Sequence, residues 1–170
     1  MRHTRAFTLI ELVVVLAVLG LLAAAAAVKF HGLFGRTRLQ AAARGLGDHF
    51  ALAVRRAYVT GGYHTLVFDL ETGRYWIKEG RRDEEGRSFL MRRLVRGVSF
   101  ADIQVGGNLY VPPGTLSVEI SPLGVTNDLL VNLQDSEGGE AAVWLNALVQ
   151  SVEYFSERKN FEDFKAPSAF

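Results

Sequence analysis

The first thirty residues contain an almost unbroken apolar run. Within residues 7–28 only Thr8 and Glu11 are polar. A helix of 22 residues rises about 33 Å, which is enough to cross the hydrocarbon core of a bilayer. Arg2 and Arg5 precede the run, and positive charges in this position favour an N-terminus that stays in the cytoplasm. The pattern predicts a membrane-spanning helix over residues 7–29.

The same run also fits a secretory signal peptide, because the alanines at 23–27 could supply a small-residue cleavage site. Cleavage there would release a soluble protein that begins near Val28. Glu11 distinguishes the two interpretations. A charged side chain within a membrane span costs about 2.5–3.5 kcal/mol on insertion scales. A disposable segment has no reason to carry that cost, so we interpret the run as a retained helix.

A helical pattern continues after the apolar run. Apolar residues recur at steps of three, four and seven, at Leu39, Leu46, Phe50, Val54 and Ala57. This spacing predicts an amphipathic continuation of the helix over residues 30–60 that lays one face on a core. Gly61 and Gly62 follow as a left-handed C-cap.

Residues 61–155 change to short runs with a period of two, separated by turn signals and without helical segments. The strands that we expect lie at 64–70, 74–78, 98–105, 108–111, 115–120, 129–133, 141–146 and 148–155. Residues 79–88 form a charged loop, and residues 156–170 form a polar tail with spaced phenylalanines. The predicted fold class is α+β, with one long N-terminal helix packed on an antiparallel β-sheet domain.

Charge is unevenly distributed, although the net charge is only +1. Residues 1–73 carry +4, residues 74–96 carry +4, and residues 101–170 carry −7. A nucleic-acid-binding protein is expected to show a sustained basic surface, so this distribution argues against nucleic acid as a partner. A chain with one basic and one acidic region can instead dock on copies or relatives of itself.

We find no motif for catalysis or for a cofactor. The chain has no cysteine, which excludes disulfides, thiolate zinc sites and cysteine nucleophiles. Its four histidines are scattered, and motifs for hydrolases, zinc proteases and P-loop proteins are missing. The acids Asp135, Glu137 and Glu140 lack the spacing of a calcium loop, so we interpret them as a solvated turn. We expect a protein that is not an enzyme and needs no cofactor or metal.

The start of the chain resembles the signal of type IV pilins and of the pseudopilins of type II secretion. The stretch Phe-Thr-Leu-Ile-Glu-Leu at residues 7–12 fits the family pattern residue for residue, after a short basic leader at residues 1–6. The resemblance implies cleavage between Ala6 and Phe7 by a prepilin peptidase, followed by N-methylation of Phe7. Ala6 stands where the family usually has Gly, which is a departure from the pattern.

The resemblance also implies a partner for Glu11. In the family, this carboxylate pairs with the N-terminal amine of a neighbouring subunit, so Phe7 and Glu11 would act in filament assembly. Within one helix the two residues are four apart, so a pairing inside the chain is also possible. Between subunits, a buried ion pair of this kind would specify one axial register.

Later segments resemble the GspH/FimT-like minor pseudopilins, on residues 120–124 (Ile-Ser-Pro-Leu-Gly) and 144–149 (Trp-Leu-Asn-Ala-Leu-Val). In the second segment Val149 stands where Gly is usual. This resemblance implies a pilin-like fold and a minor pseudopilin at or near the tip of a short filament that drives protein export across the outer membrane.

The resemblance also implies a location for the chain. This location is the bacterial inner membrane, with a single span, a cytoplasmic N-terminus and a periplasmic domain over residues 61–155. The implied partners are other minor and major pseudopilins, the prepilin peptidase, inner-membrane lipid and secreted cargo. Two alternatives remain open from the sequence. One is a minor pilin of a type IV pilus or DNA-uptake filament, and the other is a membrane-tethered ligand-binding β-domain that does not polymerise.

Overall fold

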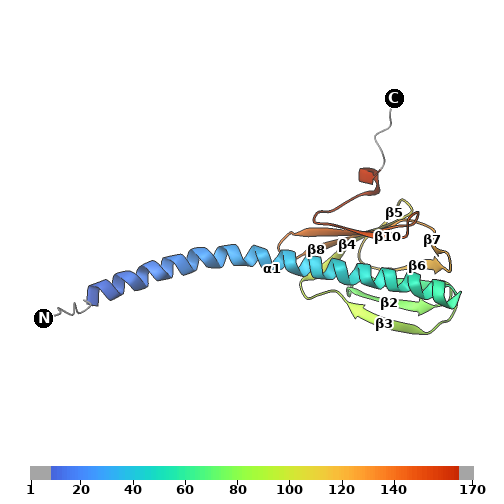
Figure 1. The fold of residues 1–170 in the computed structure, drawn as a ribbon, viewed down its shortest axis with the longest axis horizontal. Helices are drawn as coiled ribbons and strands as arrows, with labels where there is room; N and C mark the ends of the chain where they lie inside the picture. The colour runs from blue at the N-terminus through green and yellow to red at the C-terminus, as the bar shows by residue number, and fades with distance from the viewer. Residues whose placement is uncertain (1–8, 165–170) are drawn as a thin grey trace, which may run out of the picture. The chain divides into compact units, whose positions relative to one another are not determined.

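The computed structural model of the 170-residue chain describes the backbone of residues 9–164 and the side chains of residues 9–24 and 36–164. The chain divides into two compact units, Met1–Gly35 and Arg36–Phe170. The first unit contributes the start of a helix, and the second contains the rest of that helix and all the strands (Figure 1).

Helix α1 spans Leu9–Thr60. It ends where the sequence predicts, because Gly61 adopts a φ of 63°, the left-handed conformation that glycine tolerates without a steric penalty. The Thr60 hydroxyl donates a hydrogen bond of 2.9 Å to the Arg56 carbonyl in the last turn. Within the second unit, the apolar stripe predicted from the spacing is confirmed as the buried face. Leu39, Leu46 and Phe50 are each at most 3% exposed.

Ten strands and one short 3-10 helix follow α1 in the described chain. The strands are β1 (His64–Asp69), β2 (Arg74–Glu79), β3 (Ser88–Arg93), β4 (Val98–Val105), β5 (Asn108–Tyr110), β6 (Thr115–Ser121), β7 (Gly124–Val125), β8 (Leu129–Asp135), β9 (Glu140–Asn146) and β10 (Ser151–Phe155), and the helix is η1 (Phe161–Phe164).

The strands form two antiparallel sheets of five strands each. The first has the order β3-β2-β1-β6-β7, and the second has the order β10-β9-β8-β4-β5. Within the second unit, α1 lies across both sheets, with β2 and β3 on one side of it and β8 and β10 on the other (Figure 1). The α+β class and the antiparallel arrangement predicted from the sequence are therefore confirmed.

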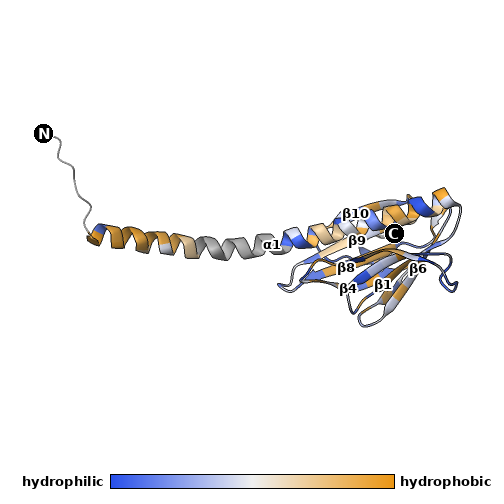
Figure 2. Cartoon of the chain, turned by 90° about the horizontal axis from the view of Figure 1, so that it is seen from below, coloured by the Kyte–Doolittle hydropathy of each residue, from blue (hydrophilic) through white to orange (hydrophobic). Residues whose placement is uncertain are grey.

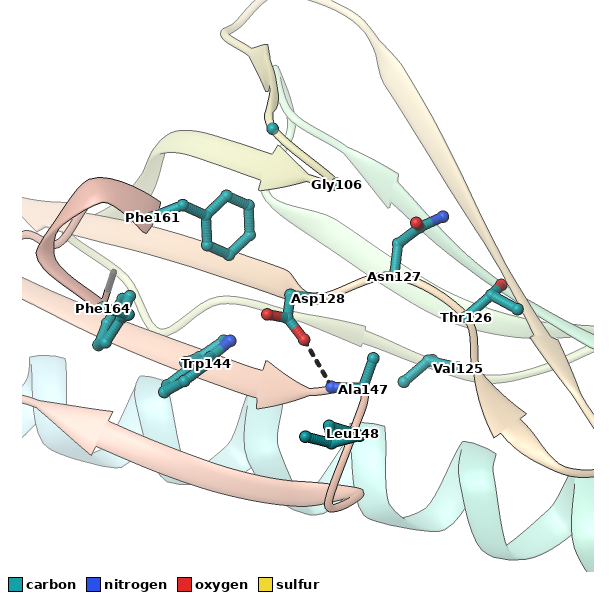
Figure 3. Close-up of a pocket in the computed structure, with 11 residues that line it drawn as sticks. Gly106, Val125, Thr126, Asn127, Asp128, Trp144, Ala147, Leu148, Phe161 and Phe164 are labelled. Carbon is teal, nitrogen blue, oxygen red and sulfur yellow. Dashed lines mark hydrogen bonds between the residues drawn. The ribbon is translucent and has the colours of Figure 1, made fainter. Parts of the chain in front are cut away.

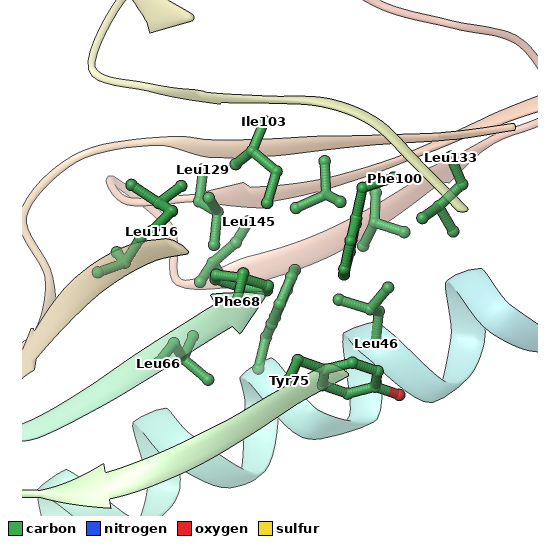
Figure 4. Close-up of a cluster of buried hydrophobic side chains, with 14 of the residues drawn as sticks. Leu46, Leu66, Phe68, Tyr75, Phe100, Ile103, Leu116, Leu129, Leu133 and Leu145 are labelled. Carbon is green, nitrogen blue, oxygen red and sulfur yellow. The ribbon is translucent and has the colours of Figure 1, made fainter. Parts of the chain in front are cut away.

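One continuous core joins α1 to both sheets (Figure 4). Leu46 and Phe50 of α1 meet Phe68 of β1 and Phe100 of β4, and all four are at most 1% exposed. Phe68 stacks edge-to-face on both Phe50 and Phe100, with ring centroids 6.1 and 6.0 Å apart. Such pairs contribute about 0.5–1.5 kcal/mol beyond their buried area, so these rings fix how the two sheets close on the helix.

The sequence did not predict β3, which lies directly after the charged loop. Most of its residues are exposed, and its pairing with β2 shifts register between Tyr75 and Ile77. At this bulge Leu90 takes a φ of 52°, a conformation that non-glycine residues seldom adopt. An exposed, bulged edge strand lacks the apolar alternation by which strands are recognised, which explains why this strand was missed.

Candidate functional site

The described first part of α1, residues 9–24, presents apolar side chains on all sides (Figure 2). Its large aliphatic residues are between 46% and 83% exposed. A helix that is hydrophobic all round is stable only when a membrane or a bundle of other helices surrounds it. This segment is therefore a surface that needs a partner.

Glu11 is the one charged residue of that segment. It lies in the first turn of the described helix, where the helix dipole favours a negative charge, and its side chain is exposed. The neighbours of Glu11 along the helix are aliphatic. A partner helix that packs on these aliphatic side chains would therefore also enclose the carboxylate in apolar surroundings. An ionised carboxylate in such surroundings needs a cation.

The predicted cleavage and methylation residues, Ala6 and Phe7, lie outside the described residues, so their geometry relative to Glu11 stays a prediction. Within the part of the chain that the structure describes, no helix meets the combined length and hydropathy of a membrane span.

A second candidate surface lies on the outer face of the second sheet, the face turned away from α1. The strand register sets two rows of residues side by side across β4, β8 and β9. One row contains Gln104, Leu130 and Trp144, and the other contains Asp102, Asn132 and Ala142. A bulge in β4 between Phe100 and Asp102 keeps Phe100 in the core while Asp102 turns outward.

The C-terminal strap, residues 158–164, covers these rows and buries their polar side chains. Asp102 and Asn132 are 0% exposed, and Gln104 is 8% exposed. Arg158 Nη2 lies 2.7 Å from Asp102 Oδ2, while Asn132 Nδ2 donates 2.9 Å to Asp102 Oδ1. Gln104 Nε2 donates 3.0 Å to Asn160 Oδ1. Buried polar groups are stable only when they are paired in this way. The strap supplies partners for the buried side chains of Asp102 and Gln104, and these side chains in turn hold the strap on the sheet.

An aromatic cleft opens where the strap ends (Figure 3). It has a volume of about 750 Å³, and Trp144, Phe161 and Phe164 form its apolar wall. Phe164 stacks on Trp144, with ring centroids 4.2 Å apart and planes inclined by 26°. On the opposite side, the Asp128 carboxylate accepts a hydrogen bond of 2.7 Å from the Ala147 amide (Figure 3). Leu148 lies at the rim and is 91% exposed.

Sequence reasoning missed both the burial of Asp102, Gln104 and Asn132 and the cleft. Polar residues in a strand are read as solvent-facing, so Asp102, Gln104 and Asn132 gave no signal of burial. The spaced phenylalanines of the tail were the available signal, because Phe161 and Phe164 are the residues that line the cleft.

Asp135 stabilises the turn between β8 and β9 through its side chain. Asp135 Oδ1 accepts hydrogen bonds from the amides of Glu137 and Gly139, at 2.9 and 2.7 Å. The carboxylate thus closes its own turn, as Asp commonly does. Among the described residues, no group of His, Asp and Glu side chains is arranged to hold a metal ion.

His49 is the buried group with the most altered acidity. Burial, reinforced by the positive charge of Arg92, lowers the pKa of His49 to about 4. The ring is 3% exposed and stacks edge-to-face on Tyr75, with centroids 5.0 Å apart. The imidazole is thus neutral near pH 7 and serves as part of the interface between α1 and β2.

Comparison with known proteins adds two findings. Residues 1–27 match the family model described as the prokaryotic N-terminal methylation motif. The fold is similar to the solved structure of the minor pseudopilin EpsH from the type 2 secretion system of Vibrio cholerae, with a TM-score of 0.55 and 12% sequence identity. The likeness covers 70% of this chain and 97% of that one.

The chain is type IV pilin-like. This statement rests on the N-terminal motif and on the fold, which were both predicted from the sequence. No curated protein sequence matches the chain. For a pilin-like chain, the exposed apolar helix with its single carboxylate and the aromatic cleft at the end of the C-terminal strap become candidate contact surfaces for other proteins.

Proposed function

We propose that the chain is a minor pseudopilin of a type II secretion system. In this proposal, it is anchored in the bacterial inner membrane by a single span, with its N-terminus in the cytoplasm and its β-domain in the periplasm. A prepilin peptidase removes residues 1–6 and methylates Phe7. The mature subunit then assembles at or near the tip of a periplasmic filament that drives protein export across the outer membrane.

One observation carries this proposal: the described start of α1 is apolar on every side and holds a single carboxylate, Glu11, in its first turn. A plain anchor gains nothing from that charge, because a carboxylate within a membrane is costly. In a bundle of subunits the carboxylate pairs with the methylated Phe7 amine of a neighbour. The charge then selects the axial position at which one helix packs against the next.

The match of residues 1–27 to the N-terminal methylation motif supports the processing step. The likeness to EpsH, which is a minor pseudopilin, supports the pilin-like fold that the proposal requires. A pilus subunit would share this fold, so the choice of a secretion filament is part of the proposal. The role is mechanical and recognitional rather than enzymatic: the helix packs in the filament, and the β-domain meets other pseudopilins or secreted cargo.

Co-expression with a prepilin peptidase tests the proposal. The expected product begins at N-methyl-Phe7, as seen in the intact mass and in the N-terminal peptide. A matched culture with an inactive peptidase should retain residues 1–6. An uncut chain, or a product that begins near Val28, would contradict the proposal and favour a tethered or released β-domain.

A second experiment separates secretion from pilus assembly. The mature chain is cross-linked in membranes that contain the pseudopilins of a secretion system or the pilins of a type IV pilus. Cross-links to pseudopilins alone are expected. Cross-links to pilins alone would assign the chain to a pilus or DNA-uptake filament.

A further inference from the structure

Four exposed arginines gather at the end of the β-domain where α1 enters it. Arg92 and Arg93 end β3, Arg96 lies in the turn that leads to β4, and Arg38 lies near the start of the domain's part of α1. We call these four residues the basic end. Arg93 and Arg96 line one cleft of about 490 Å³, and Arg38 Nη1 lies 3.8 Å from the position that a Cβ on Gly97 would take.

Among the described residues, none of these four arginines forms an ion pair. The ion pairs found among the described residues join Arg158 to Asp102 and Lys159 to Glu157, and neither involves the basic end. Arg93 Nε donates 3.0 Å to the Thr72 carbonyl, which orients its guanidinium without cancelling its charge. Glu71 is the acidic residue that lines the same cleft.

Apolar side chains lie between the arginines. Val95 is 41% exposed and Met91 is 61% exposed, and the left-handed backbone of Leu90 holds this part of the β3 edge out of regular pairing. Arginines that alternate with exposed aliphatic residues are typical of surfaces that enter the headgroup layer of a membrane.

The position of the basic end in the chain favours the membrane as its partner. Ten residues separate Arg38 from Val28, the end of the predicted apolar run, and ten helical residues rise about 15 Å. Headgroups extend several ångströms beyond the hydrocarbon core, and charges interact across a Debye length of about 8–10 Å. The short separation along the chain is therefore the reason for choosing lipid phosphates as the partner of the basic end.

The acidic C-terminal half of another copy is a weaker candidate than lipid as the binding partner of the basic end, because several of its carboxylates already have partners within the chain. Asp102 is buried beside Arg158, Asp128 and Asp135 accept backbone amides, and Glu157 pairs with Lys159. We propose that the basic end binds anionic phospholipid headgroups and holds the β-domain of the unassembled subunit against the membrane. This inference rests on the proposed membrane anchor.

The test uses the full chain in lipid nanodiscs. Because the chain has no cysteine, Val95→Cys gives a single site for an environment-sensitive fluorophore. The discs contain phosphatidylcholine alone or mixed with phosphatidylglycerol. We expect the emission to rise about twofold or more only with phosphatidylglycerol, and to fall back in roughly 0.5 M salt. A label at Leu148→Cys, at the opposite end of the domain, should not respond.

Matched charge variants complete the test. Arg38→Gln combined with Arg96→Gln should abolish the response at position 95. Arg55→Gln combined with Arg82→Gln removes two exposed arginines elsewhere and should preserve it. Loss of the response in both pairs would overturn the proposal, because net charge alone would then explain binding.

Further outcomes would overturn the inference. Equal emission in the two lipids would show that anionic headgroups are not recognised. Emission that rises only when two chains share a disc would identify a second copy as the partner. An incorporated chain without a lipid-dependent signal overturns this inference alone, whereas a chain that does not enter discs of either lipid overturns the membrane anchor as well.

Discussion

The side chain of Asn132 pairs with the backbone of Lys159 in the manner of a neighbouring strand. Its Oδ1 accepts a hydrogen bond of 3.1 Å from the Lys159 amide, and its Nδ2 donates one of 2.9 Å to the Lys159 carbonyl. The strap that these two hydrogen bonds hold in place also shields the Asn132 side chain from water. At Lys159 the C-terminal strap is therefore fixed to the sheet through its main chain, which adds to the side-chain contacts of Arg158, Asn160 and Phe164.

Replacing Asn132 should release the strap. Asn132→Ala removes both hydrogen bonds and leaves Asp102 without one of its donors, so we expect a loss of about 1–3 kcal/mol. Hydrogen exchange at the Lys159 and Phe161 amides should accelerate, and in a Trp76→Phe background the fluorescence of Trp144 should shift to the red as Phe164 leaves it. Gln134→Ala, an exposed position on the same strand, is the control. Unchanged exchange in Asn132→Ala would show that the strap is held by its aromatic contacts instead.

His49 should make stability depend on pH. Its folded-state pKa of about 4 lies below the ordinary value of 6.5, so the unfolded chain binds the proton more readily. The contribution of neutral His49 is complete above about pH 6.5 and is lost as the pH falls towards 4, by about 2–3 kcal/mol. His49→Phe keeps a ring against Tyr75 and cannot titrate, so its unfolding free energy should fall less over this range. Chemical unfolding of both chains in detergent between pH 7 and pH 4 measures the difference, and parallel curves would contradict the assignment.

Ala6 should limit the rate of processing. One methyl group in a tight pocket is worth about 1–3 kcal/mol, so Ala6→Gly should be cleaved about tenfold faster or more. A time course of mature product with purified peptidase in membranes measures this rate. Thr4→Gly, which adds the same flexibility two residues earlier, should leave the rate unchanged. Equal rates for the native chain and Ala6→Gly would show that the pocket accepts Ala as well as Gly.

Glu11→Ala should spare insertion and folding but impair assembly. Removing one partner of a buried ion pair leaves the other charge unpaired and costs about 3–5 kcal/mol, so recovery in filaments should fall by at least tenfold. Val15→Ala trims an apolar side chain one helical turn away and should assemble almost normally. The amount of processed chain in sheared filaments, relative to the amount in membranes, is the measurement. Normal assembly of Glu11→Ala would refute a role of this carboxylate in register.

Sequence patterns predicted the parts of the fold in which burial follows periodicity. The stripe through Leu46 and Phe50 repeats every three to four residues, and β1 contains an apolar run between turn signals. In contrast, β3 is an edge strand that remains exposed and bulged, and its sequence, Ser-Phe-Leu-Met-Arg-Arg, does not alternate between apolar and polar residues. The two-residue β7 is too short to produce any pattern.

The sequence likewise indicated one part of the candidate site and not the other. Glu11 could be recognised as a candidate functional residue from the sequence, because a single carboxylate within an apolar run is energetically costly and needs a functional reason. Asp102 and Asn132 could not, because their burial depends on a segment about 27 to 56 residues further along the chain, which contacts Asn132 through its backbone and Asp102 through the Arg158 side chain. No residue-type pattern in the strap records that contact.

Attachment through the main chain at Lys159 leaves the side chain of that residue free to change, whereas Arg158, Asn160 and Phe164 contact the sheet through their side chains. Glu162 is exposed to solvent, and the hydrogen bonds to Asn132 depend only on the Lys159 amide and carbonyl. Any L-residue other than proline supplies both groups. The strap can therefore acquire new outward-facing residues, by evolution or by design, without losing its place on the sheet, so this edge of the domain can change its binding partner while the fold beneath it stays the same.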